Sequence, residues 1–239
     1  MRLLVGIDDT DSVDSDHGTG WVSRDLGAEL AAAHDLSWVG SVRQQFLVDD
    51  RVPYTTHNSA ACLVFEVDDD RDDPREAVVA DAGAYLADVM ADVADPGLCV
   101  APEADVPATV TAFGHRAQTD VVEKHEAHAV AEDAGVFLDE YGGTGDGVIG
   151  ALGAVGLTAA GEDGRFIAYG DIREYGSRVT VSRLRSDGIA VVDTDGRPVE
   201  AGVVNTHGWI RPQLRDGAPR LPVELDGDGG DDLLRPANL

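Results

Sequence analysis

The chain contains only two cysteines, Cys62 and Cys99, and neither belongs to a CxxC pair. A zinc ribbon needs paired cysteine ligands, so it is excluded, and a disulfide framework is disfavoured. We expect both cysteines to be small apolar core residues. No stretch reaches the ~18 consecutive apolar residues that span a bilayer, and an aspartate already stands at the eighth residue, where a signal peptide would be apolar. These absences favour a cytoplasmic enzyme or binding protein.

Lysine is almost absent as well. Lys124 is the only lysine among 18 basic residues, which face 45 acidic residues and leave a formal charge of −27. Acid spread along the whole chain, with more aspartate than glutamate, is typical of proteins from halophilic archaea, where molar salt shortens the Debye length to ~3 Å and screens self-repulsion. The charge therefore indicates a habitat rather than a ligand, and it does not exclude a nucleic-acid partner.

The hydrophobic pattern predicts alternating strands and helices. The first hundred residues read as a βαββα unit with strands over 2–7, 37–48 and 59–67 and helices over 19–35 and 76–93. Three prolines within residues 95–108 then mark the expected domain boundary.

A second α/β unit and a β-rich region are expected beyond this boundary. The expected elements are a helix around 115–134, a strand at 136–138, a helix at 148–159 and a strand at 165–169. Residues 179–224 read as β-hairpins with Asp-Gly turns at 187–188 and 195–196, and the last residues read as a frayed tail.

Three aspartates follow the first expected strand, in the sequence GIDDTDS. Asp8, Asp9 and Asp11 repel one another, and a bound cation relieves this repulsion. The helix expected from Thr19 directs its amides and its positive dipole end towards the same loop. Carboxylates beside a helix N-terminus suit a Mg²⁺–nucleotide site, because the oxygens hold the hard cation and the amides hold the phosphate. The alternative is a solvated acidic turn. Further candidate nucleotide ligands in this segment are Thr10, Ser12, Gly18 and Thr19.

A second polar cluster lies in VPYTTHNSAACLVFEV, where neutral donors precede an apolar strand. Such a cluster can hold a base, a sugar or a phosphate without ionisation, although an ordinary polar turn explains it equally well. The candidate ligands are Thr55, Thr56, His57 and Asn58.

The stretch GTGDGVIGALGAVG contains a GxGxxG match that starts at Gly145. Its last glycine, Gly150, is followed by Gly153 and Gly156 at three-residue spacing. This repetition favours a helix face packed closely against a sheet or another helix over a dinucleotide site.

Two other polar groups carry less signal. His125 and His128 lie three residues apart on an expected helix, but a metal site needs a third ligand, so an exposed acidic helix is the preferred interpretation. Asp171 and Arg173 follow a strand end, and no further pattern singles them out.

Several of these stretches occur together, in the same order, in one family. GIDDTDS, PYTT with its following asparagine, RAQTDVVEKHEA, and GVIGALGAVG followed by FIAYGDIRE resemble the archaeal isoleucine-tRNA agmatidine synthetases. The resemblance covers residues 1 to about 175. It implies a kinase-like α/β domain, placed over 1–100, followed by a ferredoxin-like domain, placed over 108–178. Beyond the resemblance, the sequence pattern predicts a C-terminal β extension over 179–225 and a flexible tail over 226–239.

The resemblance also implies a reaction. In that family ATP phosphorylates the C2 oxygen of the wobble cytidine of a tRNA, and agmatine then displaces the phosphate. Asp8, Asp9 and Asp11 match the family's Mg–ATP and catalytic loop, so ATP, Mg²⁺, tRNA and agmatine are the implied ligands. Because the sequence has no CxxC motif, we expect a truncated paralogue without the family's oligonucleotide-binding barrel and zinc ribbon. A partner protein is then a candidate source of tRNA contacts.

Two other functions stay open. Asp9-Thr10-Asp11 after an apolar strand looks like the nucleophile loop of haloacid-dehalogenase phosphatases, which need a downstream lysine or arginine. A non-catalytic binding subunit with the same fold is the second alternative; retention of all three aspartates disfavours it.

Overall fold

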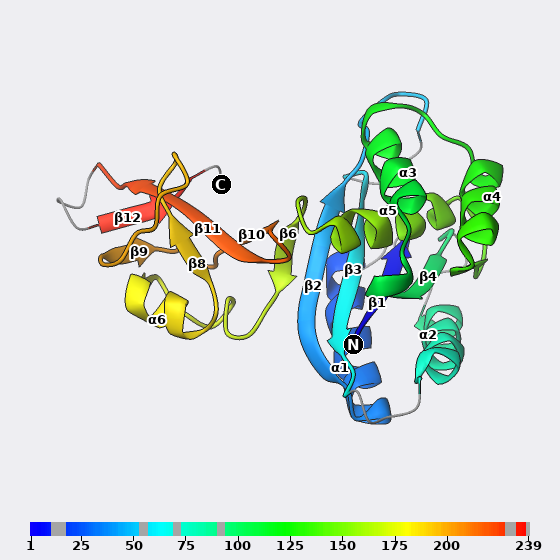
Figure 1. Ribbon diagram of the computed structural model, residues 1–239, viewed down its shortest axis with the longest axis horizontal. Helices are drawn as coiled ribbons and strands as arrows, with labels where there is room; N and C mark the ends of the chain where they lie inside the picture. The colour runs from blue at the N-terminus through cyan, green and yellow to red at the C-terminus, as the bar shows by residue number, and fades with distance from the viewer. Residues whose placement is uncertain (11–17, 53–56, 69–72, 90–93, 228–232, 238–239) are drawn as a thin grey trace. The chain divides into compact units, whose positions relative to one another are not determined.

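The computed structural model describes residues 1–10, 18–52, 57–68, 73–89, 94–227 and 233–237. The chain divides into two compact units, Met1–Ala160 and Gly161–Leu239, here called unit 1 and unit 2. Figure 1 shows unit 1 from blue to green and unit 2 from yellow-green to red. Six α-helices lie in the described residues together with strands in both units, which confirms the mixed α/β class. None of these described helices has the length and apolar character that crossing a bilayer requires.

Unit 1 begins with the predicted βαββα pattern and continues into a fourth strand. Its elements are β1 (Arg2–Asp8), α1 (Thr19–His34), β2 (Ser37–Gln45), β3 (Ser59–Glu66), α2 (Arg75–Val89), β4 (Gly97–Pro102), the 3₁₀ turn η1 (Glu103–Asp105), α3 (Ala108–Thr119), α4 (Lys124–Ala134), β5 (Phe137–Glu140) and α5 (Gly147–Ala160). The sheet order within the unit is β5-β4-β1-β3-β2, and all neighbours are antiparallel. The order of the elements from β1 to β4 is that of ferredoxin-like units, whereas the family resemblance implies such a unit over 108–178.

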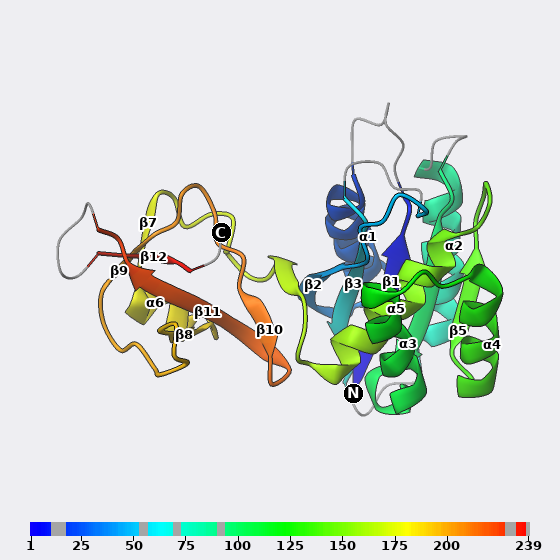
Figure 2. The ribbon, with the colours of Figure 1, turned by 90° about the horizontal axis from the view of Figure 1, so that it is seen from above.

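Helices cover both faces of this sheet. Helix α1 packs on β2 and β3 and touches α2, while α5 packs on β1, β3 and β4 with α3 against it (Figure 2). The strands are buried accordingly, and the side chains of Leu3, Leu4 and Val5 in β1 are fully shielded from solvent. Gly6 lets α5 approach, because a Cβ at this position would lie 2.2 Å from the carbonyl oxygen of Ala151. The close approach places the middle of α5 against the end of β1.

The division between the units falls at residues 160–161 rather than within 95–108. Strand β4 lies inside that proline-containing segment and pairs with β1, and α5 packs on the same sheet. Residues 108–160 therefore complete unit 1. The prolines terminate β4 and precede α3 without separating two compact units.

The single helix expected around 115–134 is wrong, because two helices occupy the region. Helix α3 ends at Thr119, and α4 begins at Lys124 with a capping box between Glu123 and Glu126. The amide of Glu123 donates to the Glu126 carboxylate at 2.9 Å. This reciprocal cap satisfies amides that an uninterrupted helix would bond internally, and it starts a new helix after the β-branched pair Val121–Val122.

Unit 2 is mainly β-structure. Its elements are β6 (Arg165–Ala168), β7 (Arg178–Thr180), α6 (Val181–Ser186), β8 (Ala190–Val192), β9 (Val203–Asn205), β10 (Gln213–Arg215), β11 (Ala218–Leu225) and β12 (Leu233–Pro236). The strand order is β6-β10-β11-β12-β9-β7, and β8 pairs in parallel with β11. The turns at Asp187–Gly188 and Asp195–Gly196 are confirmed, since both glycines adopt positive φ near 84° and 83°.

Two expectations for unit 2 are wrong. Helix α6 interrupts the region that reads as hairpins; its N-cap is Thr180, whose hydroxyl accepts a hydrogen bond from the amide of Arg183. The last residues are not simply frayed either, because β12 pairs with β11 and β9 and buries Leu233 and Leu234. The remainder of the expected tail, 228–232 and 238–239, lies outside the described residues.

The cysteine expectation is confirmed. Cys62 and Cys99 are free and fully buried in β3 and β4. Burial raises the pKa of the Cys62 thiol to about 12. Both side chains therefore serve as small apolar core groups.

Candidate functional site

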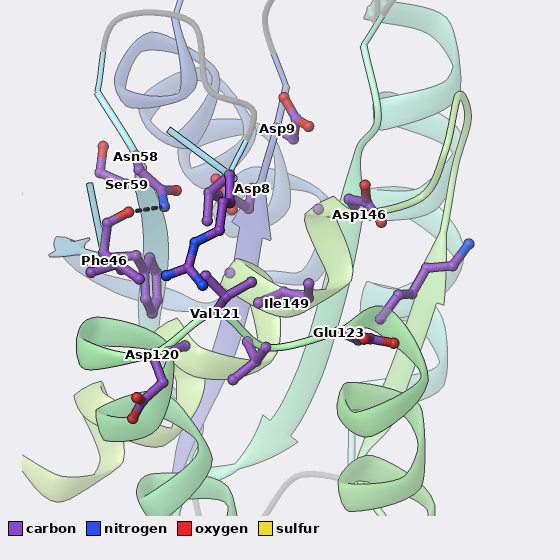
Figure 3. Close-up of a pocket in the computed structure, with 18 of the residues that line it drawn as sticks. Asp8, Asp9, Phe46, Asn58, Ser59, Asp120, Val121, Glu123, Asp146 and Ile149 are labelled. Atoms are coloured by element: carbon purple, nitrogen blue, oxygen red, sulfur yellow. Dashed lines mark hydrogen bonds between the residues drawn. The ribbon is translucent and has the colours of Figure 1, made fainter. Parts of the chain in front are cut away.

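A pocket of about 530 Å³ opens in unit 1 at the carboxyl end of β1. Segments that are far apart in the sequence form its walls: the end of β1, the loop after β2, the start of β3, residues 117–125 and the start of α5. Figure 3 shows its labelled residues, with Asp8 and Asp9 from β1 and the following loop and Asp146 from the turn before α5. Five of the predicted site residues line this pocket: Asp8, Asp9, Thr19, His57 and Asn58.

Asp9 has an unusual backbone conformation. It follows β1 with a φ of 51°, in the left-handed region that few residues other than glycine, asparagine and aspartate adopt. The next residue, Thr10, is only 2% exposed, and its hydroxyl donates to the Thr19 hydroxyl at 3.1 Å. The chain thus turns sharply at Asp9 and is tied to the first residue of α1. Strained backbone of this kind is often found at functional sites.

Helix α5 presents glycine to the aspartate loop. A Cβ at Gly150 would lie 1.8 Å from Oδ2 of Asp8, and a Cβ at Gly147 would lie 3.0 Å from the carbonyl oxygen of Asp8. Only glycine lets the Asp8 carboxylate lie against the helix. Gly153 and Gly156 likewise approach Phe46 and the backbone of Val110, which confirms the interpretation of the repeated glycines as a closely packed helix face.

Two helix N-termini border the pocket, and they differ in what they offer. The amides of Gly147 and Ile149 in α5 already donate to Asp95 and Asp146 carbonyls at 3.1 and 3.0 Å, so α5 contributes mainly its dipole. Helix α1 has Gly18 at its N-cap and no side-chain cap. An N-terminus without a side-chain cap is a common position for a phosphate.

Carboxylates dominate the charge of the pocket. Besides the two predicted aspartates, the lining acidic residues are Asp120, Glu123 and Asp146. No cluster of three or more metal-ligating side chains is found among the described residues, and Asp11, the third predicted ligand, lies outside them. An acidic pocket favours a bound cation, because the cation offsets the repulsion among carboxylates.

The two strongly basic lining residues are each engaged by a carboxylate. Arg51 forms a bidentate contact with Asp49, at 2.8 Å for both oxygens, and its hydrogen bonds hold the pKa of Asp49 well below its usual range. Lys124 donates to Glu140 at 2.8 Å and to the carbonyl of Thr144 at 2.6 Å, and the Glu140 bond raises its pKa. Lys124 therefore lies at the pocket, as a phosphatase of the haloacid-dehalogenase type requires, but its ammonium group is held by other groups.

Apolar side chains form part of the wall. Phe46 is 5% exposed and Val121 is 39% exposed, and both line the pocket together with Ile149 (Figure 3). An exposed valine inside a pocket offers a surface for a flat apolar ring. The break between α3 and α4 brings Val121 here, since the linking residues leave the helical path.

Asn58 has a structural role at the rim. Its side-chain nitrogen donates to the Leu47 carbonyl at 2.6 Å, and its own carbonyl accepts from the amide of Phe46 at 2.8 Å. These bonds join the start of β3 to the loop after β2. His57 is exposed at the same rim.

The remaining predicted ligands do not line the described pocket. Thr10 is buried beneath the loop, and Gly18 is exposed at the start of α1. The others fall outside the described residues: Asp11, Ser12, Thr55 and Thr56.

Sequence reasoning missed several lining residues. They are Phe46, Arg51, Asp120, Val121, Glu123, Asp146 and Ile149. The sequence did contain patterns that could have indicated two groups of them. Asp146 stands in the Gly-Asp-Gly turn before the glycine-rich helix, and residues 120–123 belong to the stretch RAQTDVVEKHEA. Phe46 and Arg51 carried no recognisable pattern.

No protein-family model matches the sequence, and no curated protein matches it. Solved structures do match. A tRNA fluorescent labeling enzyme is 28% identical with a TM-score of 0.52, and the match covers 65% of this chain and 36% of that one. The apo form of TiaS, a tRNA agmatidine synthetase, is 27% identical with a TM-score of 0.51 over 65% of this chain and 35% of that one. The complex of TiaS with its tRNA and ATP is also 27% identical, with a TM-score of 0.52, and the match covers 65% of this chain and 36% of that one. The chain thus spans about a third of the length of these proteins, and its fold is similar to that of a tRNA-modifying, ATP-using enzyme.

Proposed function

We propose that this chain is an ATP- and Mg²⁺-dependent phosphoryl-transfer enzyme that acts on a tRNA cytidine or on a smaller acceptor. One observation supports the proposal most strongly. Four separate stretches of the sequence that resemble the agmatidine synthetases contribute residues to the same pocket. Solved neighbours with a similar fold include a complex with tRNA and ATP, which supports the same ligands here.

The pocket fits a magnesium–nucleotide in chemistry and in size. Asp8 and Asp9, with Asp11 by sequence, supply the oxygen ligands that Mg²⁺ prefers. A volume of about 530 Å³ lies within the range of pockets that enclose small ligands. Bound MgATP supplies a phosphoryl group whose charge the cation neutralises.

The chain's own residues then position and activate the acceptor. The N-terminus of α1 stabilises phosphate charge, and the wall formed by Phe46, Val121 and Ile149 excludes water from one side. One of the loop aspartates accepts the proton of the acceptor or orients it. Agmatine is a candidate second substrate, because a neighbouring TiaS structure contains tRNA, an ATP analogue and agmatine. A partner protein is a candidate source of additional tRNA contacts.

Thermal unfolding in molar KCl tests the nucleotide site. A ligand present at a hundred times its dissociation constant stabilises the native state by ~2.7 kcal/mol, which raises the Tm of a chain of this size by about 5–10 °C. The variant Asp9→Asn removes one charge and keeps a side chain that tolerates the left-handed backbone. We expect wild type to show the MgATP-dependent rise and this variant to lose most of it.

Asp105→Asn is the matched control, since Asp105 is an exposed aspartate of unit 1 in η1, outside the pocket lining. It should respond to MgATP as wild type does. No rise in wild type at millimolar MgATP would contradict the proposal and favour the non-catalytic subunit. Release of phosphate from small phosphoesters without ATP would favour the phosphatase instead. Incubation with labelled ATP and either total tRNA or a metabolite pool then identifies the acceptor.

A further inference from the structure

Unit 2 carries a disproportionate share of the basic residues. Residues 161–239 contain ten arginines and fourteen acidic residues, a net charge of −4, whereas residues 1–160 contain eight basic and thirty-one acidic residues, a net charge of −23. In a chain this acidic, arginine that gathers in one place needs a reason beyond solubility.

The strand register gathers three of these arginines. Arg165 in β6 pairs with Gln213 in β10. Two backbone hydrogen bonds extend this pairing: the amide of Phe166 donates to the Pro212 carbonyl at 2.8 Å, and the amide of Leu214 donates to the Gly164 carbonyl at 3.0 Å. Side chains two residues apart on a strand share a face, so Arg215 of β10 lies diagonally across from Arg165. Arg211, two residues before β10, is close enough to repel the Arg165 guanidinium. Diagonal neighbours on a sheet lie within reach of long side chains, so like charge gathers around Arg165.

A fourth arginine joins them through an aromatic ring. The guanidinium carbon of Arg173 lies 4.0 Å from the ring centroid of Trp209, and that of Arg211 lies 4.4 Å from it. Arg173 also donates to the Ile167 carbonyl at 3.1 Å. The ring holds two exposed guanidinium groups in place through cation–π contact. We call Arg165, Arg173, Arg211, Arg215 and Trp209 the arginine patch.

The charges of the four arginines in the patch are not paired with carboxylates among the described residues. Within the described residues, none of its four arginines forms a salt bridge, while Arg183, Arg185 and Arg235 of the same unit pair with carboxylates at 2.6–2.8 Å. Burial and repulsion from Arg211 and Arg215 lower the pKa of Arg165. Burial and the nearby charge of Arg211 also lower the pKa of Arg173, although the carboxylate of Glu174 acts in the opposite direction and raises it. Positive charge is therefore concentrated where the chain supplies little to balance it.

We propose that the arginine patch binds the phosphate backbone of RNA. The planar fork of arginine matches phosphate oxygens in bidentate fashion, and several guanidinium groups side by side suit a polymer that carries a phosphate at every residue. The choice of RNA over another polyanion rests on the proposed function, whereas the phosphate-binding chemistry follows from the patch itself. All five residues of the patch belong to unit 2, and none of them lines the pocket of unit 1.

The test measures binding of a fluorescein-labelled oligouridine to the full chain by anisotropy, without ATP, over a series of KCl concentrations. Each phosphate contact adds about 0.7 to the slope of log K against log salt for a single strand. Arg165→Gln combined with Arg211→Gln should weaken binding by tenfold or more and reduce that slope by about 1.4. Trp209→Leu keeps every charge and loosens two arginines, so it should weaken binding about twofold to fivefold with little change in slope.

Arg185→Gln combined with Arg235→Gln is the matched control. It removes the same charge from the same unit, but both arginines are paired with glutamates, Glu200 and Glu224. It should bind as wild type does within about twofold. Thermal unfolding of each variant checks that it is folded, and Arg165→Lys with Arg211→Lys, which keeps the charge, should recover part of the affinity.

Three results would overturn the proposal: no binding by wild type at the lowest salt in which circular dichroism shows it folded, equal losses in patch and control variants, or displacement of RNA by polyglutamate at equal charge. The last result would point to an acidic protein partner. RNA binding is measured without ATP and nucleotide binding by the MgATP-dependent rise in Tm, so failure at the nucleotide pocket and failure at the arginine patch give separate readouts and remain distinguishable.

Discussion

Unit 1 gathers carboxylates around its pocket, and unit 2 gathers arginines around Trp209. The formal charge of the whole chain, −27, conceals this difference, because 23 of those negative charges belong to unit 1 and only 4 to unit 2. Composition alone suggests one uniformly acidic surface. The net charge of the whole chain therefore does not describe how charge is distributed between the two units.

The largest expected effect concerns the packing of unit 1. A Cβ at Gly6 would lie 2.2 Å from the Ala151 carbonyl oxygen and 2.8 Å from the Val155 side chain. Gly6→Ala must push α5 away from β1, and overpacking of this kind costs about 3 kcal/mol. We expect faster amide hydrogen exchange in β1 and loss of the MgATP-dependent rise in Tm.

Gly227→Ala serves as its counterpart in unit 2. No heavy atom lies within 4 Å of a Cβ built at Gly227, so this substitution should leave the Tm nearly unchanged. Equal stability of both variants would mean that α5 does not contact β1 as closely as the structure has it.

The two units should respond differently to a change in salt concentration. Lowering KCl from molar to about 0.1 M lengthens the Debye length from ~3 to ~10 Å and unmasks repulsion among carboxylates. Because unit 1 carries the larger net charge, its amide exchange should accelerate more than that of unit 2. Hydrogen-exchange mass spectrometry on the full chain measures both units at once, and equal acceleration would remove the physical basis of the comparison.

The smallest effect concerns one carboxylate of unit 1 that favours folding. The hydrogen bond from the amide of Glu123 lowers the pKa of Glu126, with help from Arg116. A lowered folded pKa gives stability that is present above the ordinary glutamate value near 4.5 and is lost as pH falls through the folded value. Glu126→Gln keeps the capping geometry and removes this titration.

Between pH 5 and 3 the Tm of wild type should therefore fall slightly more than the Tm of Glu126→Gln. Parallel pH profiles of the two proteins would show that the cap acts through geometry alone.

Local pattern was sufficient for much of unit 1. The βαββα order follows from apolar runs and the helical repeat of Val22, Leu26 and Leu30, all of which are buried. The aspartate loop was predicted for the same reason, since charge directly after a buried strand is conspicuous.

Tertiary pairing decided the rest. The sequence of β4 lies between prolines and reads as a boundary, and only its pairing with β1 shows that it is central. The pocket residues Phe46 and Asp120 meet through folding alone, because nothing in their local sequence relates the end of β2 to the end of α3. The arginine patch depends on the cross-strand register of β6 and β10, which the sequence did not specify.

The left-handed turn at Asp9 narrows what position 9 can be. Glycine and asparagine accept that backbone readily but carry no charge, and glutamate carries the charge but has a longer side chain that does not favour the conformation. Aspartate alone among the natural residues meets both demands. Asp9 thus joins a backbone conformation that aspartate tolerates to a carboxylate that lines the pocket, and an asparagine at this position would preserve the shape of the loop while giving up its charge.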